Sequence, residues 1–369
     1  MSSTPRKRPA PDALVAGIVV AILAALVVAV FLTGAGSTLY PPEAATAQGR
    51  EVRGLYDIVF AFAVAIFIVV EALIVWSVLR YRRKPSDVEL PVQTHGNNLV
   101  EVIWTVVPTA IVLFLFVVSW NTLNNVDAVS DEPDIRIHAI AGQFAWQFEY
   151  LDESGSQVVA TQLVPSYDAE SGLGGMAVPV GRSVQVTLDS PDVIHAFYVP
   201  RFLFKRDVVP GQTNRFEFTV DADEAGQVFR GQCAELCGTG HRQMLFNVIA
   251  LTPVDYETWL AALVEKSNAT PAPLPSGTVL NVTAAAVKYD TATLEVSADA
   301  PFGIVFKNDD PAAISHDIDI KDAGGAIVAD QEVIAGGTTA NYSYAPLAAG
   351  TYTFFCSIHA NMTGTLTAK

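Results

Sequence analysis

The stretch Cys233-Ala-Glu-Leu-Cys-Gly-Thr-Gly-His-Arg-Gln-Met244 places two thiols, an imidazole and a thioether on one short loop. Soft sulfur ligands combined with imidazole suit copper, zinc or iron, and a thioether favours copper. A single loop cannot surround a metal ion, so a further ligand must come from another strand. His195 is the upstream candidate. We therefore interpret this loop as a metal site, with the ligands His195, Cys233, Cys237, His241 and Met244.

The third and last cysteine lies in a related loop, Cys356-Ser-Ile-His-Ala-Asn-Met362. Together with His316, this loop offers one thiolate, two imidazoles and a thioether, from His316, Cys356, His359 and Met362. That set is typical of a mononuclear blue-copper site that transfers electrons. The first loop offers more ligands than one tetrahedral ion takes. Two copper ions bridged by both thiolates would use them all, and an electron shared over two ions favours a relay over a catalyst.

Other chemistries are also compatible with these residues. A disulfide between Cys233 and Cys237 is one alternative, since an exported chain permits disulfides. A Cys2His2 zinc site is another. For the second loop, the alternative is a lone thiol beside two ordinary histidines. Neither alternative for the first loop explains Met244, and neither explains why the pattern is repeated around Cys356.

The composition predicts a membrane protein and argues against a nucleic-acid partner. The chain has 369 residues, of which 51% are hydrophobic, and its mean hydropathy is +0.34. Acidic residues number 38 against 22 basic ones, which disfavours binding to phosphate backbones. The acidic excess either steers a cationic partner towards the protein or only keeps the outer part soluble.

Three apolar runs open the sequence: Leu14–Leu32, Leu55–Leu79 and Val102–Val118. Each is near the length of a membrane span. Basic residues precede the first run and follow the second, and the positive-inside rule then puts everything after about residue 121 on the outer side of the cell membrane. The first run is either a retained span or a removed signal peptide.

From Ile135 onward, apolar and polar residues alternate with a period of two, which predicts antiparallel β-sandwiches or barrels. A short helix is expected over Pro253–Lys266, followed by a stiff Pro-rich linker. The predicted fold is thus a membrane-anchored all-β chain with N-terminal transmembrane helices and two cupredoxin-like β domains. The predicted parts are a signal peptide or first span (1–48), a helical hairpin (49–125), a first β domain (126–267), a linker (268–277) and a second β domain (278–369).

Several separate motifs resemble one known family, subunit II of the haem-copper cytochrome c oxidases, over residues 50–265. They are the segments 95–105, 143–150 and 192–200 and the loop 233–244. The resemblance implies a dinuclear CuA centre held by His195, Cys233, Cys237, His241, Met244 and the carbonyl of Glu235. It also implies that the Glu235 side chain binds magnesium at the border with subunit I. Glu101 would lie at the mouth of a proton pathway into that subunit.

One departure from the family concerns the donor. The family commonly has tryptophan where this chain has Phe144, and that ring receives electrons from cytochrome c; Trp146 is retained two residues later. Phe144 and Trp146 are thus the candidate positions for electron input. Residues 277–369 resemble short-loop cupredoxins such as amicyanin, which suggests that this fused domain delivers electrons to CuA. The electron donor to this chain would be cytochrome c or a small copper protein.

The predicted function is therefore the subunit through which electrons enter a respiratory terminal oxidase. Its type 1 copper and CuA would pass electrons to haem in subunit I, where oxygen is reduced. Other oxidase subunits would also be partners of this chain. This chain itself would only transfer electrons. The alternatives are the copper subunit of a nitric-oxide reductase and a membrane-tethered copper-delivery protein without redox turnover.

Overall fold

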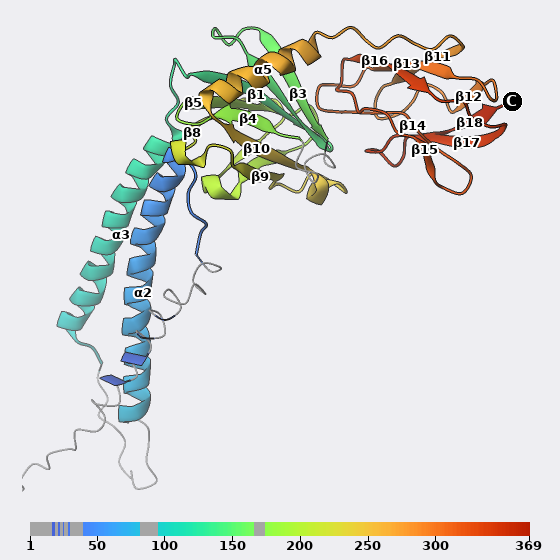
Figure 1. The fold of residues 1–369 in the computed structure, drawn as a ribbon. Helices are drawn as coiled ribbons and strands as arrows, with labels where there is room; N and C mark the ends of the chain where they lie inside the picture. The colour runs from blue at the N-terminus through green and yellow to red at the C-terminus, as the bar shows by residue number, and fades with distance from the viewer. Residues whose placement is uncertain are drawn as a thin grey trace, which may run out of the picture. The chain divides into compact units, whose positions relative to one another are not determined.

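A computed structural model describes residues 40–81, 95–165 and 174–369, with isolated positions between 17 and 29. Most of the first apolar run and the basic residues Arg6–Arg8 and Arg82–Lys84 lie outside these described residues. The chain is divided into two compact units. One is helical and the other, shown with it in Figure 1, contains both β domains.

The helical unit contains α2 (Ala47–Tyr81) and α3 (Asn98–Asp127). These helices cover the second and third apolar runs, and each is long and apolar enough to cross a membrane. Their side chains are mostly exposed, as expected when lipid rather than protein surrounds them. Pro108 lies inside α3.

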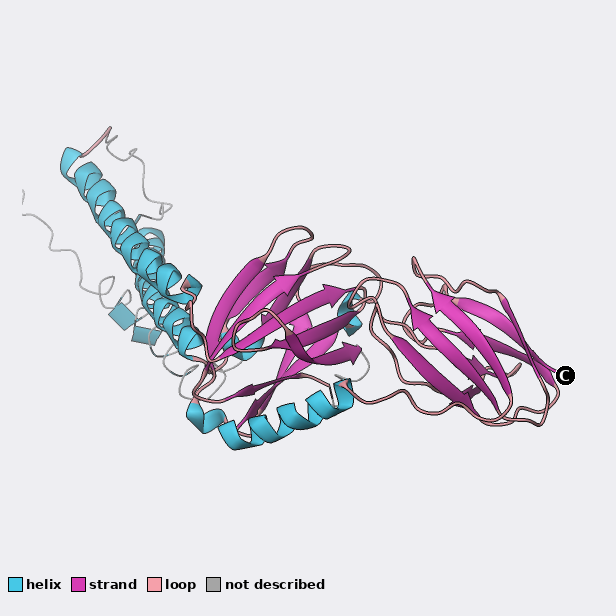
Figure 2. Cartoon of the chain, turned by 90° about the horizontal axis from the view of Figure 1, so that it is seen from above, coloured by secondary structure: helices cyan, strands magenta, loops and turns pink. Residues whose placement is uncertain are grey.

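The first β domain has two five-stranded sheets, in the orders β3-β2-β1-β5-β8 and β4-β10-β9-β6-β7. Figure 2 shows each β domain as a sandwich of its own. Helix α5 (Pro253–Ser267) follows the last strand, with the Thr252 side chain capping its start. The strands are β1 (Ile135–Gly142), β2 (Ala145–Leu151), β3 (Val158–Pro165), β4 (Met176–Pro179), β5 (Ser183–Asp189), β6 (His195–Val199), β7 (Phe204–Val208), β8 (Asn214–Thr219), β9 (Val228–Cys233) and β10 (Leu245–Leu251).

The second β domain pairs a three-stranded sheet, β11-β13-β16, with a five-stranded one, β12-β18-β17-β14-β15. β14 begins at Asp319, and His316, three residues earlier, forms an isolated bridge with Ile334. The strands are β11 (Thr278–Ala284), β12 (Thr293–Val296), β13 (Phe302–Asn308), β14 (Asp319–Lys321), β15 (Ile327–Ala329), β16 (Thr339–Tyr344), β17 (Gly350–Phe355) and β18 (Thr363–Ala368).

The expectation of purely antiparallel sheets is wrong. β1 runs parallel to β5, and β4 to β10. In the second domain β11 runs parallel to β13, and β12 to β18. A period of two indicates that a strand has one buried face, but it is the same for parallel and antiparallel neighbours. Long crossing connections decide the direction, and no local pattern reports them.

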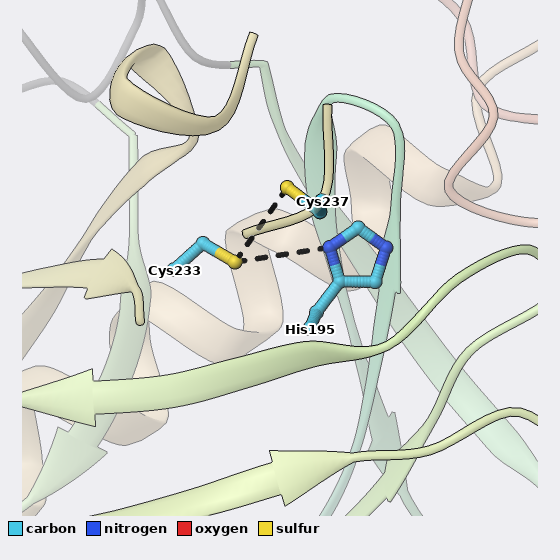
Figure 3. A group of neighbouring side chains, drawn as sticks. All are labelled: His195, Cys233 and Cys237. Carbon is cyan, nitrogen blue, oxygen red and sulfur yellow. Dashed lines mark hydrogen bonds between the residues drawn. The ribbon is translucent and has the colours of Figure 1, made fainter. Parts of the chain in front are cut away.

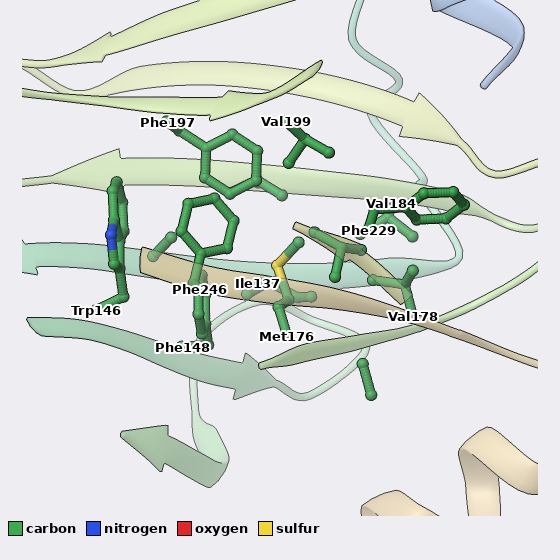
Figure 4. Packing of buried hydrophobic residues seen from close by; sticks show 14 of the residues in the cluster. Ile137, Trp146, Phe148, Met176, Val178, Val184, Phe197, Val199, Phe229 and Phe246 are labelled. Atoms are coloured by element: carbon green, nitrogen blue, oxygen red, sulfur yellow. The ribbon is translucent and has the colours of Figure 1, made fainter. Parts of the chain in front are cut away.

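Aromatic rings fill the core of the first domain (Figure 4). Phe246 lies 4.7 Å from Phe197 and 4.9 Å from Trp146, centroid to centroid. The ring also covers Gly231 on the neighbouring strand β9, where a Cβ atom would lie 2.3 Å from it. Glycine is therefore required at this position by the space that the Phe246 ring occupies.

Candidate copper centres

The first candidate site lies between β9 and β10, two antiparallel neighbours. The Cys233 amide donates to the Met244 carbonyl at 3.0 Å and closes the loop at its base. His195, the first residue of β6, comes from the strand on the other side of β9. Figure 3 shows its ring facing the two thiols. The structure thus brings together the residues that sequence spacing singled out.

The distances in this site fit a metal cluster better than a disulfide. The Sγ atoms of Cys233 and Cys237 are 3.8 Å apart, against about 2.05 Å in a disulfide bond. His195 Nδ1 lies 3.8 Å from Cys233 Sγ, and His241 Nδ1 lies 3.6 Å from Cys237 Sγ. Met244 Sδ is 3.9 Å from Cys237 Sγ. Each soft donor atom therefore faces a sulfur across a gap that an ion could fill.

Hydrogen bonds fix the orientation of His195. Its Nε2 lies 2.9 Å from Asp192 Oδ1, which leaves Nδ1 to face the thiols. Burial lowers the pKa of His195, but the hydrogen bonds to Asp192 and Cys233 outweigh burial and raise it to about 9. A carboxylate behind the imidazole is the usual support of a metal-ligating histidine, because it fixes the ring and makes it a better ligand.

The two thiols share one hydrogen bond, so they do not ionise alike. The hydrogen bond with Cys237 is the main cause that lowers the pKa of Cys233. The pKa of Cys237 is raised by the same contact with Cys233 and by burial. Binding of copper by both sulfurs would displace the protons that remain on them.

The second candidate site repeats this plan on β17 and β18. The Cys356 amide donates to the Met362 carbonyl at 3.0 Å, just as Cys233 does to Met244. Cys356 Sγ lies 3.8 Å from Nδ1 of both His316 and His359. The Met362 side chain is buried. Ligand atoms of the sets His195/Cys233/Cys237 and His316/Cys356/His359 lie within 4.8 Å of one another in each set.

The imidazoles of the second site are also held from behind. His316 Nε2 lies 2.8 Å from Asp310 Oδ2. The same carboxylate accepts hydrogen bonds from the amides of Ala286 and Val287, both of which have positive φ. Burial and the charge of His316 lower the pKa of His359 to about 4. Burial raises the pKa of the Cys356 thiol to about 12. The histidine is thus ready to bind metal, whereas the thiol must lose its proton first.

An acidic pair lies beside this loop: Asp317 directly follows His316, and Asp319 is the first residue of β14. Asp317 accepts hydrogen bonds from the amide and the hydroxyl of Ser357, next to Cys356. Asp319 accepts one from the Gln331 amide at 2.8 Å. Burial and the charge of Asp317 raise the pKa of Asp319 to about 7. Asp319 is only 2% exposed, so its charge has little water to stabilise it.

Asp319 makes the stability of the second domain depend on pH. Its carboxyl holds a proton more tightly in the folded chain, so stability is highest below the unfolded-state pKa of about 4 and falls as pH rises towards 7. We expect Asp319→Asn, which can still accept from Gln331, to be about 2 kcal/mol more stable than the unmodified chain at pH 8 and about equal at pH 4. Chemical denaturation of the full chain at both pH values measures this. An equal difference at both values would contradict it.

The other residues singled out in the sequence lie as follows. The Glu235 carbonyl accepts from Cys233 Sγ at 3.3 Å, and its carboxylate lies 3.5 Å from Lys205 Nζ. The Glu101 carboxylate accepts from the Asn97 amide at 3.2 Å and helps to cap the start of α3. Trp146 is fully buried, so a donor protein cannot contact it directly. Phe144 is half-buried, and its ring lies over Gly240 of the copper loop.

Three further residues belong to these sites and were not assigned a role from sequence. Asp192 and Asp310 orient His195 and His316, and the Gln143 side-chain amide donates to the Cys237 carbonyl. For Asp192, its position three residues before a ligand histidine was a usable signal. Asp310 and Gln143 gave none, because their partners are adjacent in space and distant along the chain.

A β-sandwich whose Cys/His/Met loop joins two antiparallel strands, with one more histidine from a nearby segment, defines the cupredoxin class of copper proteins. This chain contains that arrangement twice. Family models agree: "Cytochrome C oxidase subunit II, periplasmic domain" matches residues 135–251, "Cytochrome C oxidase subunit II, transmembrane domain" matches 35–122 and "Cupredoxin-like domain" matches 258–368. The chain belongs to the cytochrome c oxidase subunit II family and carries a cupredoxin-like domain after it.

Individual relatives agree with this assignment. The chain is 31% identical over 297 residues to "Probable cytochrome c oxidase subunit 2" of Streptomyces coelicolor, covering 72% of this chain and 89% of the relative. A protein of the same name from Streptomyces avermitilis is 30% identical with the same coverage. Among solved structures, the periplasmic domain of subunit II of cytochrome oxidase from Bradyrhizobium japonicum is 27% identical, with a TM-score of 0.32, covering 38% of this chain and 99% of that one.

Proposed function

We propose that this chain is the subunit through which electrons enter a respiratory terminal oxidase. Electrons would pass from the cupredoxin-like domain to a dinuclear copper centre in the first β domain, and from there to haem in subunit I. The first centre would hold a pair of copper ions on His195, Cys233, Cys237, His241 and Met244 with the Glu235 carbonyl. The second would hold one ion on His316, Cys356, His359 and Met362. Copper bound there supplies reversible one-electron chemistry.

One observation carries this proposal: two buried sulfur–imidazole clusters lie in one chain of the subunit II family, each with one histidine held from behind by an aspartate. Ligands fixed in this way change little when an electron arrives or leaves, which favours fast transfer. Burial also limits access of substrates and of competing ligands. Both features suit a relay.

Three finer assignments belong to the same proposal. The Glu235 carboxylate would bind magnesium at the border with subunit I, in place of its contact with Lys205. Glu101 would lie at the mouth of a proton pathway, in addition to capping α3. Both β domains would lie on the outer face of the cell membrane, with domain limits at 126–267 and 278–369.

Removal of residues 270–369 tests the relay. A tethered donor domain has an effective concentration in the millimolar range, so its loss should slow oxidation of the physiological donor by about a hundredfold at micromolar donor. The dinuclear centre should keep its absorption spectrum. The measurement is steady-state oxidation of the donor by the assembled oxidase.

Cys356→Ser in the full-length chain is the matched control for this deletion. It keeps the second domain in place but removes the sulfur ligand of its copper. If the domain acts as a relay, the substitution slows donor oxidation as much as the deletion does. An unchanged rate after deletion would show that the donor reaches the dinuclear centre without the second domain.

A further inference from the structure

We propose that Gln143 is the bonded connection through which an electron passes between the two copper sites. His359 Nε2 donates to the Gln143 carbonyl oxygen at 2.9 Å. The Gln143 side-chain amide in turn donates to the carbonyl oxygen of Cys237. His359 belongs to one ligand set and Cys237 to the other. The covalent bonds of a single residue therefore join them, and this inference rests on the relay proposed above.

The fold explains why Gln143 occupies this position. β1 ends at Gly142 and β2 begins at Ala145, so Gln143 and Phe144 form the tip of a tight two-residue hairpin. The Gln143 amide donates to Asp192 Oδ2 at 2.8 Å, and Asp192 also holds His195. The hairpin tip is thus anchored to the ligand shell of the first site, while its carbonyl faces the second domain.

The contact around this bond is close and specific. A Cβ atom on Gly142 would lie 2.9 Å from the Ala313 carbonyl oxygen, so glycine allows the two domains to approach here. The Ala313 amide donates to Gln147 Oε1 at 3.2 Å. Ala313 is fully buried, and Gln147, a strand residue, is only 4% exposed. Buried polar groups that are paired across a contact disfavour other ways of docking, because each would lose its partner.

An open region lies beside this hydrogen bond. A cavity of 560 Å³ lies next to it, lined by Phe144, Asp192 and Gly238 of the first domain and by Asp310, His359 and Asn361 of the second. Electrons tunnel less readily across empty or solvent-filled space than through covalent and hydrogen bonds. The Gln143 connection therefore crosses the interface beside an open region.

The step is a simple one-electron exchange. With copper bound, the set His316, Cys356, His359 and Met362 would hold an ion that gives up one electron, and the set around Cys233 and Cys237 would hold the copper that accepts it. No bond between atoms forms or breaks, and no proton needs to move, because His359 keeps its Nε2 proton throughout.

The test uses the full copper-loaded chain in detergent. A photochemical reductant injects less than one electron per chain, and the blue and near-infrared absorptions are followed as they relax together. We expect Gln143→Met, which fills similar space but donates no hydrogen bond, to slow this relaxation by about tenfold, or about 1.4 kcal/mol in activation free energy. Gln212→Met, the same change at an exposed position of the same domain, should leave the rate unchanged.

The outcomes separate this inference from the relay itself. Electron transfer within one chain proceeds at a rate that does not depend on chain concentration. If the unmodified chain shows no such relaxation, the relay proposal fails. If the unmodified chain relaxes and Gln143→Met relaxes equally fast, the relay stands and the Gln143 connection is wrong.

A second readout needs no metal. Hydrogen exchange of the metal-free full chain reports the Ala313 amide, which we expect to be protected in the unmodified chain and exposed in Gly142→Val, where a side chain would push Ala313 away. Lack of protection in the unmodified chain would overturn the docked contact. Gln143→Ala serves as a second variant. The inference requires that at least one Gln143 variant transfers electrons slowly while its Ala313 amide stays protected. If both variants transfer electrons slowly and lose protection of this amide, the effect is due to loss of docking between the domains.

Discussion

Cys237→Ser is expected to abolish the proposed dinuclear centre and leave the proposed blue-copper site intact. Cys237 is buried, and its sulfur faces Cys233, His241 and Met244. A serine hydroxyl is a hard and weakly acidic ligand that cannot replace a bridging thiolate. The mixed-valence near-infrared absorption and its electron paramagnetic resonance signal should disappear, and the copper content should fall by the pair of ions.

Cys356→Ser is the reciprocal control, because the second site repeats the geometry of the first. It should remove the blue absorption and one copper ion while the near-infrared absorption remains. Metal analysis together with optical and resonance spectra of both variants distinguishes the two sites. Loss of zinc instead of copper from Cys237→Ser, or a disulfide between Cys233 and Cys237 in the purified chain, would contradict the copper assignment.

Phe246→Ala is expected to cost about 3–5 kcal/mol of the free energy of unfolding of the first domain, as usual for a buried phenylalanine. The ring is fully buried and contacts Trp146 and Phe197. Chemical denaturation of the full chain, followed by the absorption of the dinuclear centre, measures the loss. Phe246 comes two residues after Met244, so the cavity opens directly beneath the copper loop.

Gly231 supplies a matched test of the same packing. Gly231→Ala alone should cost about 1–3 kcal/mol, because its Cβ would meet the Phe246 ring at 2.3 Å. In the double variant the ring is absent and the methyl group fills part of the space. The combined loss should therefore be clearly smaller than the sum of the single losses. Additive losses would show that the two positions do not share this space.

Much of the site was predictable because its ligands cluster along the chain. One loop carries Cys233, Cys237, His241 and Met244. Residues on a short loop between adjacent strands are close in space because they are close along the chain. The alternating pattern likewise predicted two β domains, and the apolar runs predicted helices. Local spacing and periodicity suffice for these features because they depend on neighbours in sequence.

The tertiary structure decided the direction of strands, the supports of the ligands and the connection between the sites. β1 pairs in parallel with β5 across a long crossing connection, which no local pattern encodes. Asp310 reaches His316, and Gln143 reaches both Cys237 and His359, only after both domains have folded. By itself the sequence determined which residues are the candidate copper ligands. Folding decided which atoms link the two sites, since hydrogen bonds between residues far apart along the chain depend on packing rather than on sequence spacing.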